Sequence, residues 1–594
     1  MMKKRTYKVK KKEKGITLIA LVVTIIVMLI LSGIAIIMIT GDNSILKQTE
    51  NAKNETEKAS AKEELEVEVL GSYDSSLNLN LDKIKSNCES RLGATVTKDD
   101  NSLLVKYKGY IFLVDDEGNV KYFDTITRTI SKSKVYANEP KLSSGMIPVK
   151  FDTKKNKWII CEKNDSEWYD YGDKKWANVM LSDGKYKSGA TVGTEVKENE
   201  LGSMFVWIPR YAYSITKYKT SANGEGQTQK ITDVSYLVGT TNIDKDGNNY
   251  KTDYDVSLVS NGNSTPKITH PAFTFGGTKL TGIWMAKFEA SMAEENKNTY
   301  DDNNVTTKTI KILPNSDSWR YINIGNSFLN CLNMKNNNIY GLSSNADTHL
   351  MKNIEWGAIA YLAASQYGIT PTINNNSSTY TENSTTKYHA YTGGNDYKAN
   401  VSQSTTGNET GIYDLNGGNR ERVAAYWDNG NGYLSGQGTS TVFPSNKLNS
   451  AYAKYWDRYE VSENEITQMK NGLWGKGASE NSTRKLITDD RYNLMKNIKG
   501  DAMYETINTY SYYGKNSSDT YAWLLTATDT TTTDCGRSYY NRDYGLLGNC
   551  SLPFLLRGGY WGNGTSAGVF YCGGWRFCGR QQRVPPGLGC VVAL

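Results

Sequence analysis

Cysteine, histidine and acidic side chains are the residues that could hold a metal ion or act as nucleophiles here, and their spacing favours neither role. The 594-residue chain has eight cysteines and three histidines. No two cysteines have the Cys-x-x-Cys spacing of a zinc or redox motif. His270, His349 and His389 lie far apart, and no motif pairs two carboxylates for acid–base work. We therefore expect no catalytic residues, no metal and no cofactor.

The C-terminal segment 555–594 is the second stretch with chemical meaning, because it is rich in Tyr, Trp, Phe, Arg and Gly. Residues 571–586 between its Arg-Gly-Gly and Val-Val-Ala words follow neither a helical nor a strand period. Rigid aromatic rings and Arg are favoured in recognition surfaces. We predict ligand contacts in loops around 537–544 and 560–582. The predicted contact residues are Tyr539, Tyr540, Tyr560, Trp561, Asn563, Thr565, Tyr571, Trp575, Phe577, Arg580, Gln581 and Gln582.

A buried framework is expected to hold these loops. The framework residues are predicted to be Arg557, Gly558, Gly559, Val569 and Phe570. The alternative is that the whole segment is an ordinary core strand of its domain. Outside the cell, Cys535 and Cys550 are the pair for which we first expect a disulfide.

The positive charge of the chain is concentrated in its first fifteen residues. The formal net charge of +7 comes from 69 basic and 62 acidic residues. Residues 1–15 hold seven Lys and one Arg against one Glu, so the remainder carries 61 charges of each sign. Nucleic-acid binding needs a basic surface that neutralises phosphates. We therefore expect no nucleic-acid partner.

Residues 16–40 are predicted to form a membrane-spanning helix. These 25 residues contain no charged side chain, and as a helix they would span about 37 Å. The preceding basic block places the N-terminus in the cytoplasm. The apolar stretch is longer than that of a secretory signal. We therefore expect a cell-membrane protein whose C-terminal domain lies outside the cell.

The junction Lys14-Gly15-Ile16-Thr17-Leu18-Ile19 resembles the leader of type IV pilins and pseudopilins. The resemblance covers about residues 1–70 and implies that a prepilin peptidase cuts after Gly15 and methylates Ile16. Family members usually have Glu at the fifth position after the cut, where this chain has Ala20. The resemblance thus implies processing, while assembly with other pilin subunits into an extracellular pilus-like structure stays open. A single uncleaved anchor is the alternative.

The helical pattern continues beyond the membrane segment, so that one pilin-like helix is expected over 16–70, with Gly71 as its stop. Its apolar stripe is predicted to contain Ile45, Leu46, Ala52, Ala59, Ala61, Leu65 and Val67. A small α/β module over 71–125 follows, with a short helix and a hairpin whose turns lie at Lys108-Gly109 and Asp116-Glu117-Gly118. A linker over 126–145 and a β-rich module with three Trp over 146–200 complete the spacer.

Six short words occur in order within residues 201–594. They are Met204-Phe-Val-Trp-Ile-Pro-Arg-Tyr, His270-Pro-Ala-Phe, Ile283-Trp-Met-Ala-Lys-Phe-Glu-Ala-Ser, Lys352-Asn-Ile-Glu-Trp-Gly-Ala-Ile-Ala-Tyr-Leu-Ala-Ala, Gly411-Ile-Tyr-Asp-Leu-Asn-Gly-Gly-Asn-Arg-Glu-Arg and Leu556-Arg-Gly-Gly-Tyr-Trp. Together they resemble the formylglycine-generating, sulfatase-modifying enzymes, whose fold is C-type-lectin-like. The resemblance implies one domain with few helices and many loops, the clearest helix being 349–366. The fold class expected for the chain is α+β.

Residues that carry the oxidase chemistry of that family are absent here. Its copper-binding cysteines stand at the fourth and ninth positions after the Arg-Gly-Gly word, where this chain has Asn563 and Gly568. Soft Cu(I) needs sulfur ligands. The family's Trp-Glu-Trp word is Arg420-Glu421-Arg422 here. We therefore expect that the chain is not an enzyme.

The aperiodic end of such a fold, over about 556–594, resembles the variable region of proteins diversified by diversity-generating retroelements. The resemblance implies that a reverse transcriptase changes adenine-containing codons and so randomises exposed side chains on a fixed frame. We expect a surface-displayed protein that binds an unknown protein or glycan ligand. The rivals are a structural minor pilin with a lectin-like cap and an enzyme of the sulfatase-modifying type.

Overall fold

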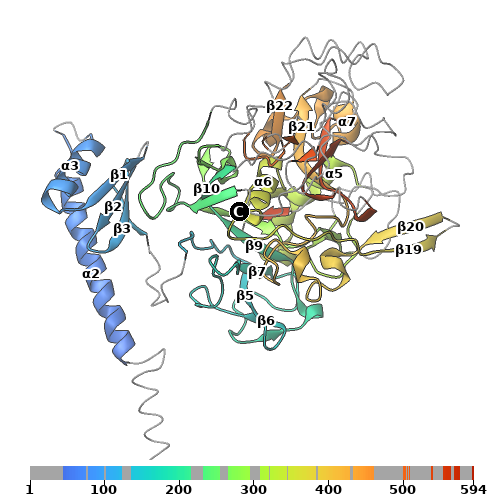
Figure 1. The fold of residues 1–594 in the computed structure, drawn as a ribbon, viewed down its shortest axis with the longest axis horizontal. Coiled ribbons are helices and arrows are strands. Elements are labelled where there is room, and N and C mark those ends of the chain that lie inside the picture. The colour runs from blue at the N-terminus through green and yellow to red at the C-terminus, as the bar shows by residue number, and fades with distance from the viewer. Residues whose placement is uncertain are drawn as a thin grey trace, which may run out of the picture. The chain divides into compact units, whose positions relative to one another are not determined.

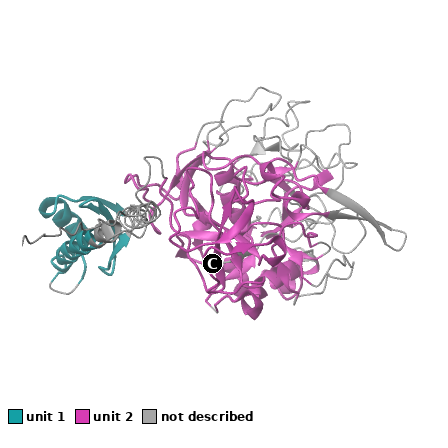
Figure 2. Ribbon diagram, turned by 90° about the horizontal axis from the view of Figure 1, so that it is seen from below, with its two compact units in different colours: residues 1–125 teal, residues 126–594 magenta. Residues whose placement is uncertain are grey.

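The computed structural model describes most of the chain beyond residue 44. The described residues are 45–74, 78–99, 102–123, 135–215, 232–254, 265–293, 308–319, 322–343, 345–382, 385–428, 433–460, 499–503, 505, 507–508, 537–538, 553–562, 567–574 and 591–593. They form a mixed α and β protein with many strands and few helices (Figure 1). The chain divides into two compact units, residues 1–125 and residues 126–594 (Figure 2).

The first unit is a helical layer on a four-stranded antiparallel sheet. Its elements are α2 (Ile45–Leu70), α3 (Leu81–Arg91), β1 (Thr95–Asp99), β2 (Ser102–Tyr107), β3 (Tyr110–Asp115) and β4 (Val120–Phe123), with the strands in sequence order. The expected stop of α2 before Gly71 is confirmed, and so are both turns. The two predicted turns join β2 to β3 and β3 to β4, and the strand that the prediction lacked is β1, which pairs with β2.

The face of α2 that packs on the sheet differs from the predicted stripe. Ala61, Leu65 and Val69, which recur every fourth residue, are buried together with Ile84 of α3. Val67 was expected in this stripe, but its side chain is 63% exposed. Among the described residues, no helix is long and apolar enough to cross a membrane. The segment predicted to do so, 16–40, lies outside the described residues.

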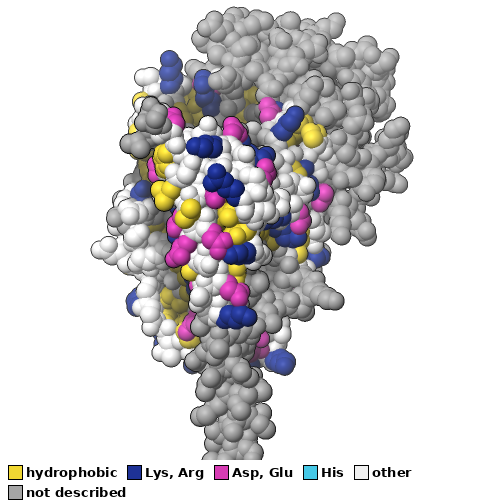
Figure 3. Space-filling view, turned by 90° about the vertical axis from the view of Figure 1, so that its left-hand side faces the viewer, with side chains coloured by type: hydrophobic (Ala, Val, Ile, Leu, Met, Phe, Trp, Pro, Cys, Tyr) yellow, Lys and Arg dark blue, Asp and Glu magenta, His cyan; other side chains and the backbone are white. Residues whose placement is uncertain are grey.

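Charges of both signs alternate on the first unit. On the face that carries α2, Lys and Arg side chains lie among Asp and Glu side chains, and neither sign forms a separate patch (Figure 3). Lys62 and Glu66 of α2 form one such exposed pair at 3.2 Å. Exposed pairs of this kind contribute less than about 1 kcal/mol each. The surface of this unit is therefore consistent with a solvated spacer.

An eight-stranded antiparallel sheet is the centre of the second unit. In spatial order its strands are β18 (Thr348–Leu350), β27 (Val591–Ala593), β15 (Gly282–Ala286), β9 (Met204–Pro209), β7 (Asn178–Leu181), β5 (Met146–Asp152), β6 (Lys157–Ile160) and β8 (Glu195–Val196). The four strands of residues 146–200 continue directly into those of residues 201–594. The expected separate module over 146–200 is therefore corrected, because β7 pairs with β9 inside one sheet.

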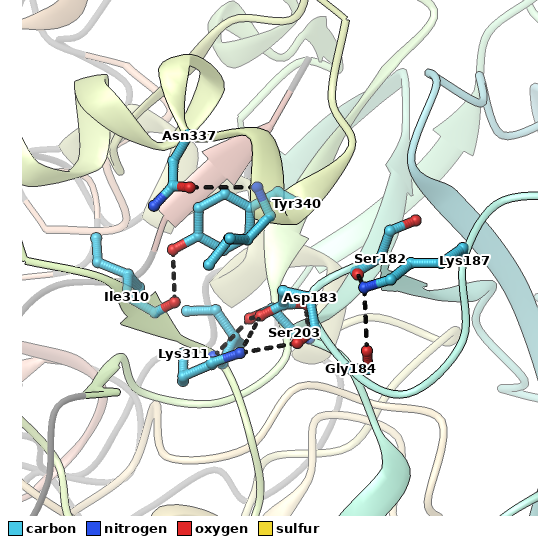
Figure 4. Close-up of polar contacts among 11 residues, drawn as sticks. Ser182, Asp183, Gly184, Lys187, Ser203, Ile310, Lys311, Asn337 and Tyr340 are labelled. Carbon is cyan, nitrogen blue, oxygen red and sulfur yellow. Dashed lines mark hydrogen bonds and ion pairs between the residues drawn. The ribbon is translucent and has the colours of Figure 1, made fainter.

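Polar side chains also join residues 146–200 to the rest of the unit. The buried Asp183 carboxylate accepts hydrogen bonds from the N–H and hydroxyl of Ser203, both at 2.7 Å, and from Lys311 Nζ at 3.0 Å (Figure 4). Trp158 donates its indole N–H to Tyr397 at 2.7 Å. Trp indole groups need such partners once they are buried. The Trp side chains taken as signs of a small module are part of the main core.

Smaller sheets and helices surround this sheet. The sheets are β11–β10–β12 (Thr232–Tyr236, Tyr211–Ile215, Ile268–Thr269) and β22–β21–β25–β26 (Asp457–Glu460, Glu421–Asp428, Phe554–Gly558, Gly568–Gly574). Two-stranded antiparallel sheets are β13–β14 (Thr274–Phe275, Thr278–Lys279), β16–β17 (Ser291–Met292, Ile310–Lys311), β19–β20 (Ser377–Glu382, Thr385–Ala390) and β23–β24 (Ile507–Asn508, Arg537–Ser538). The α-helices are α5 (Ile324–Asn333), α6 (Asn353–Ala363) and α7 (Tyr433–Gly438).

Helix α6 is shorter than the predicted helix over 349–366. Residues 348–350 form strand β18 instead, and α6 begins at Asn353. Glu355 fixes this start, because its carboxylate accepts the backbone N–H of Lys352 at 2.8 Å. Ten of the eleven α6 residues are buried, so the helix has no exposed polar face and its ends could not be placed from periodicity.

The last strand of the chain lies inside the largest sheet. β27 pairs on one side with β15, through Met285 and Val592, and on the other side with β18, through His349 and Val592. β15 and β18 meet only through β27 in the described sheet order. The C-terminal residues therefore close the sheet that holds the core together.

Replacing Val592 by Pro should destabilise the second unit by roughly 2–4 kcal/mol, because Pro removes a ladder N–H from an interior strand and leaves a buried carbonyl unpaired. Urea unfolding followed by Trp fluorescence measures the change. Val192→Pro is the matched control. Val192 is 50% exposed in a turn closed by the Thr194 N–H to the Thr191 carbonyl, where Pro fits. Equal stability of both variants would contradict the central position of β27.

Candidate functional site

Strands β25 and β26 form the C-terminal hairpin, and the predicted contact residues of the C-terminal segment are attached to it. The hairpin pairs Leu555 with Gly574 and Arg557 with Cys572, and it is bonded to β21 along its other edge. Because the strands are antiparallel, residue 553 and residue 574 lie at the same end of the hairpin. The turn over 559–567 is at the opposite end.

Arg557 is the fixed point of this hairpin. Its buried guanidinium donates to Asn353 Oδ1 and the Asp501 carbonyl through Nη1, both at 2.9 Å, and to the Ala502 and Val569 carbonyls through Nη2, both at 3.1 Å. Burial lowers the pKa of Arg557, but an Arg side chain keeps its charge. Four acceptors from three segments thus surround one cation, which ties β25 to α6, to residues 501–502 and to β26.

Gly558 and Gly559 turn the chain out of β25. Their φ angles of +76° and +79° lie in the left-handed region that favours glycine. A Cβ atom on Gly558 would stand 2.1 Å from Glu421 Oε2, so the close packing of β25 on β21 also requires glycine there. All five predicted framework residues, Arg557, Gly558, Gly559, Val569 and Phe570, are buried. This turn therefore determines where the next two residues, Tyr560 and Trp561, leave the strand.

Tyr560 and Trp561 follow the turn and are half-buried. Their rings meet edge to face at 5.7 Å. The Tyr560 ring has the Arg420 guanidinium carbon 4.4 Å from its centroid, and a Cβ on Gly562 would come within 2.5 Å of its Cε2. Tyr560 is therefore held between a cation and the backbone of Gly562. Trp561 is fixed through its backbone N–H, which donates to the Gly418 carbonyl at 3.0 Å.

The structure corrects the position of Tyr571. This residue was predicted as an exposed ligand contact, but its side chain is 3% exposed within β26. Its hydroxyl accepts a hydrogen bond from Arg420 Nε at 3.2 Å, and burial raises its pKa. The sequence around Tyr571 does not alternate between apolar and polar residues, so no strand was predicted there. The absence of alternation has a simple cause, because residues 554–558 and 568–572 of the hairpin are all buried. Its neighbour Cys572 is buried as well.

Two buried carboxylates support the loop under the Gly-Gly turn. Glu289 accepts the Asn419 N–H at 2.8 Å, and Asp414 accepts the Gly393 N–H at 2.8 Å. Burial raises the pKa of Asp414 to about 6, against the effect of its hydrogen bonds. The loop carries Gly417, whose N–H donates to the Gly558 carbonyl at 3.2 Å. These carboxylates thus hold the surface on which the turn rests.

The remaining predicted site residues lie outside the described residues. They are Gly15, Ile16, Cys535, Tyr539, Tyr540, Cys550, Asn563, Thr565, Trp575, Phe577, Arg580, Gln581 and Gln582. Their points of attachment are nevertheless given by the described strands. Residues 553 and 574 lie at one end of the C-terminal hairpin, whereas residues 562 and 567, between which 563–566 are connected, lie at the other end. The predicted contacts therefore belong to two groups.

Sequence reasoning missed the residues that position the turn. Arg420 contacts both Tyr560 and Tyr571, and Asn353 accepts from Arg557. The available signal was the pair of arginines that replaces Trp-Glu-Trp, since a buried Arg needs aromatic or polar partners. Within the described part of the chain, no group of three His, Cys, Asp or Glu side chains is placed to hold a metal ion.

Comparison with known proteins adds no identification. No model of a protein family matches the chain, and no curated protein is significantly similar to it in sequence.

Replacing Arg557 by Lys should destabilise the second unit by about 3 kcal/mol or more, because a single ammonium cannot reach four acceptors in a fork and leaves buried oxygens unpaired. Urea unfolding measures the loss. Arg458→Lys is the matched control, since the Arg458 side chain is 53% exposed and pairs with Asp428 near the surface. A loss as small as that of the control would show that the guanidinium is not the fixed point of the hairpin.

Proposed function

We propose that this chain is a surface-displayed ligand-binding protein whose C-terminal domain has the C-type-lectin-like fold of the sulfatase-modifying family. Residues 575–590, the contact segment, would be its replaceable recognition element. The observation that carries the proposal is the attachment of this segment. β26 precedes it in one sheet and β27 follows it in the largest sheet. A segment held at both ends by buried strands can change its side chains without loss of the fold.

The composition of the contact segment supports the same proposal. It contains Trp575, Phe577, Arg580 and two Gln, which combine large apolar contact area with polar anchoring. The second group, Tyr560 and Trp561, starts from the opposite end of the C-terminal hairpin, where Arg420 holds the Tyr560 ring. We assign variation mainly to the contact segment and a constant supporting role to Tyr560. An unknown protein or glycan is the ligand in this proposal.

The N-terminal part would carry this domain to the cell surface. The sequence of residues 1–40 resembles the leader and apolar segment of a type IV pilin or pseudopilin. The four-stranded sheet packed against α2 gives the helix a compact spacer. The same arrangement supports a second candidate, a minor pilin whose large domain only caps an assembly. Sequences from sibling strains separate the two, because a cap predicts ordinary substitution over 575–590 and a diversified site predicts change confined to it.

The combined substitution of Trp575 and Phe577 by Ala should reduce ligand binding at least tenfold while unfolding stays within about 0.5 kcal/mol of the parent protein. Full-length protein in detergent, screened on arrays of glycans and purified surface proteins, provides the binding measurement. Val569→Ala in the buried strand β26 is the control and should cost more than about 1 kcal/mol. A stability loss in the double variant as large as that of the control would mean that both aromatic residues are core residues.

The mature N-terminus should be a methylated Ile16, which mass spectrometry of the N-terminal peptide from cells identifies. Replacing Gly15 by Leu should abolish this cleavage, because the resemblance places the peptidase cut directly after Gly15. Ala20→Glu is the control, since it restores the usual family residue and should leave cleavage intact. Recovery of residues 1–15 on the surface protein of unaltered cells would overturn the pilin-like proposal and leave the ligand-binding proposal standing.

A further inference from the structure

Six charged side chains of alternating sign form a continuous chain beside the C-terminal strand. In order they are Lys454, Asp347, His349, Glu355, Lys352 and Asp457. Lys454 Nζ lies 2.7 Å from Asp347 Oδ2, and His349 Nδ1 lies 3.8 Å from Asp347 Oδ1. His349 Nε2 lies 3.2 Å from each Glu355 oxygen. Lys352 gives its N–H to Glu355 and its ammonium to Asp457, the latter at 3.0 Å.

Most of this charge chain is shielded from water. The side chains of His349 and Glu355 are 0% and 1% exposed, and Lys454 at one end is 43% exposed. The imidazole is stacked on Phe275, with 4.8 Å between the ring centres, and contacts Tyr455 at 5.4 Å. A buried charge without an opposite partner is costly. Each inner member therefore depends on its two neighbours.

His349 decides whether the charges balance. Three carboxylates face two lysines, so the sixth member must carry a proton for the signs to alternate. Among these six groups, imidazole is the one whose ordinary pKa lies near neutral pH. Burial acts to lower the pKa of His349, but the Glu355 and Asp347 carboxylates raise it above its ordinary value. Once the proton is lost, two carboxylates face a neutral ring.

The charge chain also controls the position of β18. His349 is the middle residue of this strand and is paired in register with Val592 of β27. Glu355 and Asp457 accept the first N–H groups at the start of α6, including the Ile354 N–H at 2.8 Å. Asp457 opens β22, and Lys454 belongs to the short helix Ser450–Tyr455. Strand β18 and three elements beside it, α6, β22 and the short helix, thus contribute to one electrostatic unit.

We propose that His349 is a proton-operated latch on the C-terminal strand: protonated, it closes the charge chain and holds β18 against β27, and deprotonated, it releases this pairing. The latch governs one end of residues 575–590, whatever their ligand. Other ionisable groups that face His349 are Asp347 on its own strand connection, Glu355 and Lys352 from the start of α6, and Lys454 and Tyr455 from the short helix. The proposed latch does not depend on the proposed ligand-binding function.

The direction of the pH effect follows from the two central groups. The pKa of His349 is higher in the folded than in the unfolded state, so protonation of His349 stabilises the fold. This stabilisation is complete below the unfolded-state pKa of about 6.5 and is lost as pH rises through the folded-state pKa. The His349 charge lowers the pKa of Glu355 against the effect of burial, so the Glu355 contribution is lost as pH falls through its own folded value. The latch is therefore closed below the ordinary His349 pKa of about 6.5, and it opens as pH rises through the raised folded-state pKa.

Hydrogen exchange on the full chain in detergent tests the latch. Exchange of the imidazole C2 hydrogen, followed by mass spectrometry, gives the pKa of His349, and only three histidines need to be resolved. Backbone amide exchange of residues 348–350 and 591–593, corrected for intrinsic rates, gives strand opening. We expect both to share one midpoint above pH 6.5. Each unit by which the pKa is raised corresponds to about a tenfold increase in opening above the midpoint.

Two substitutions should move this midpoint in opposite directions. Glu355→Gln removes the nearest negative charge and should lower the midpoint. Lys454→Met removes a positive charge that competes for Asp347, and should raise it. His349→Gln should make the opening of β27 independent of pH. His270→Gln is the matched control. His270 is equally buried, but burial lowers its pKa to about 3, so the ring stays neutral across pH 5–9.

Opening of β27 that does not follow the His349 titration would overturn the proposal. So would a midpoint that both charge substitutions leave in place or move in the same direction. Persistence of the pH-dependent opening in His349→Gln would assign it to another group. A loss of pH dependence in His270→Gln would likewise reject His349 as its source.

Discussion

The buried guanidinium of Arg557 organises the C-terminal hairpin and the segments that pack around it. Arg557 donates to acceptors from α6, from residues 501–502 and from β26, which are far apart in the sequence. A buried charge of this kind is costly without hydrogen-bond partners, so the four acceptors of Nη1 and Nη2 require these segments to meet in one arrangement. The two glycines that follow can then pass against Glu421 and send the chain to the surface. The buried Arg557 and the turn that leads to the surface are therefore consecutive in the sequence.

The sequence predicted the mixed character of the fold and the framework words better than it predicted domain boundaries. Trp158 and Trp176 were correctly expected in β-rich surroundings, but their partners, Tyr397 and the Tyr367 carbonyl, come from residues about 200 positions later. A local pattern contains no information on such pairing. The helix predicted over 349–366 failed at its start for a related reason, since α6 is buried on nearly all sides and a local pattern does not show where such a helix begins.

The candidate site was predictable where glycine or charge forced a single solution, and not where burial came from distant strands. Arg557, Gly558 and Gly559 could be assigned to a framework because an Arg-Gly-Gly turn has few uses inside an apolar run. Tyr571 could not be assigned, because its burial depends on β25 and on Arg420. Aromatic residues suit both cores and recognition surfaces. Only the neighbours decide between these roles, and they come from other parts of the chain.

The place of β27 has a consequence for how the molecule is made. Residues 591–593 lie between β15 and β18 in the eight-stranded sheet, and they are synthesised after both of these strands. Strands β15 and β18 therefore lack their shared neighbour until β27 has been made, although the first unit can fold as soon as it emerges. The core of the second unit consequently forms through a late, non-local pairing, which is a slow type of contact to form. A chain truncated before β27 would present two unpaired strand edges, the feature that promotes aggregation and attracts proteolytic quality control.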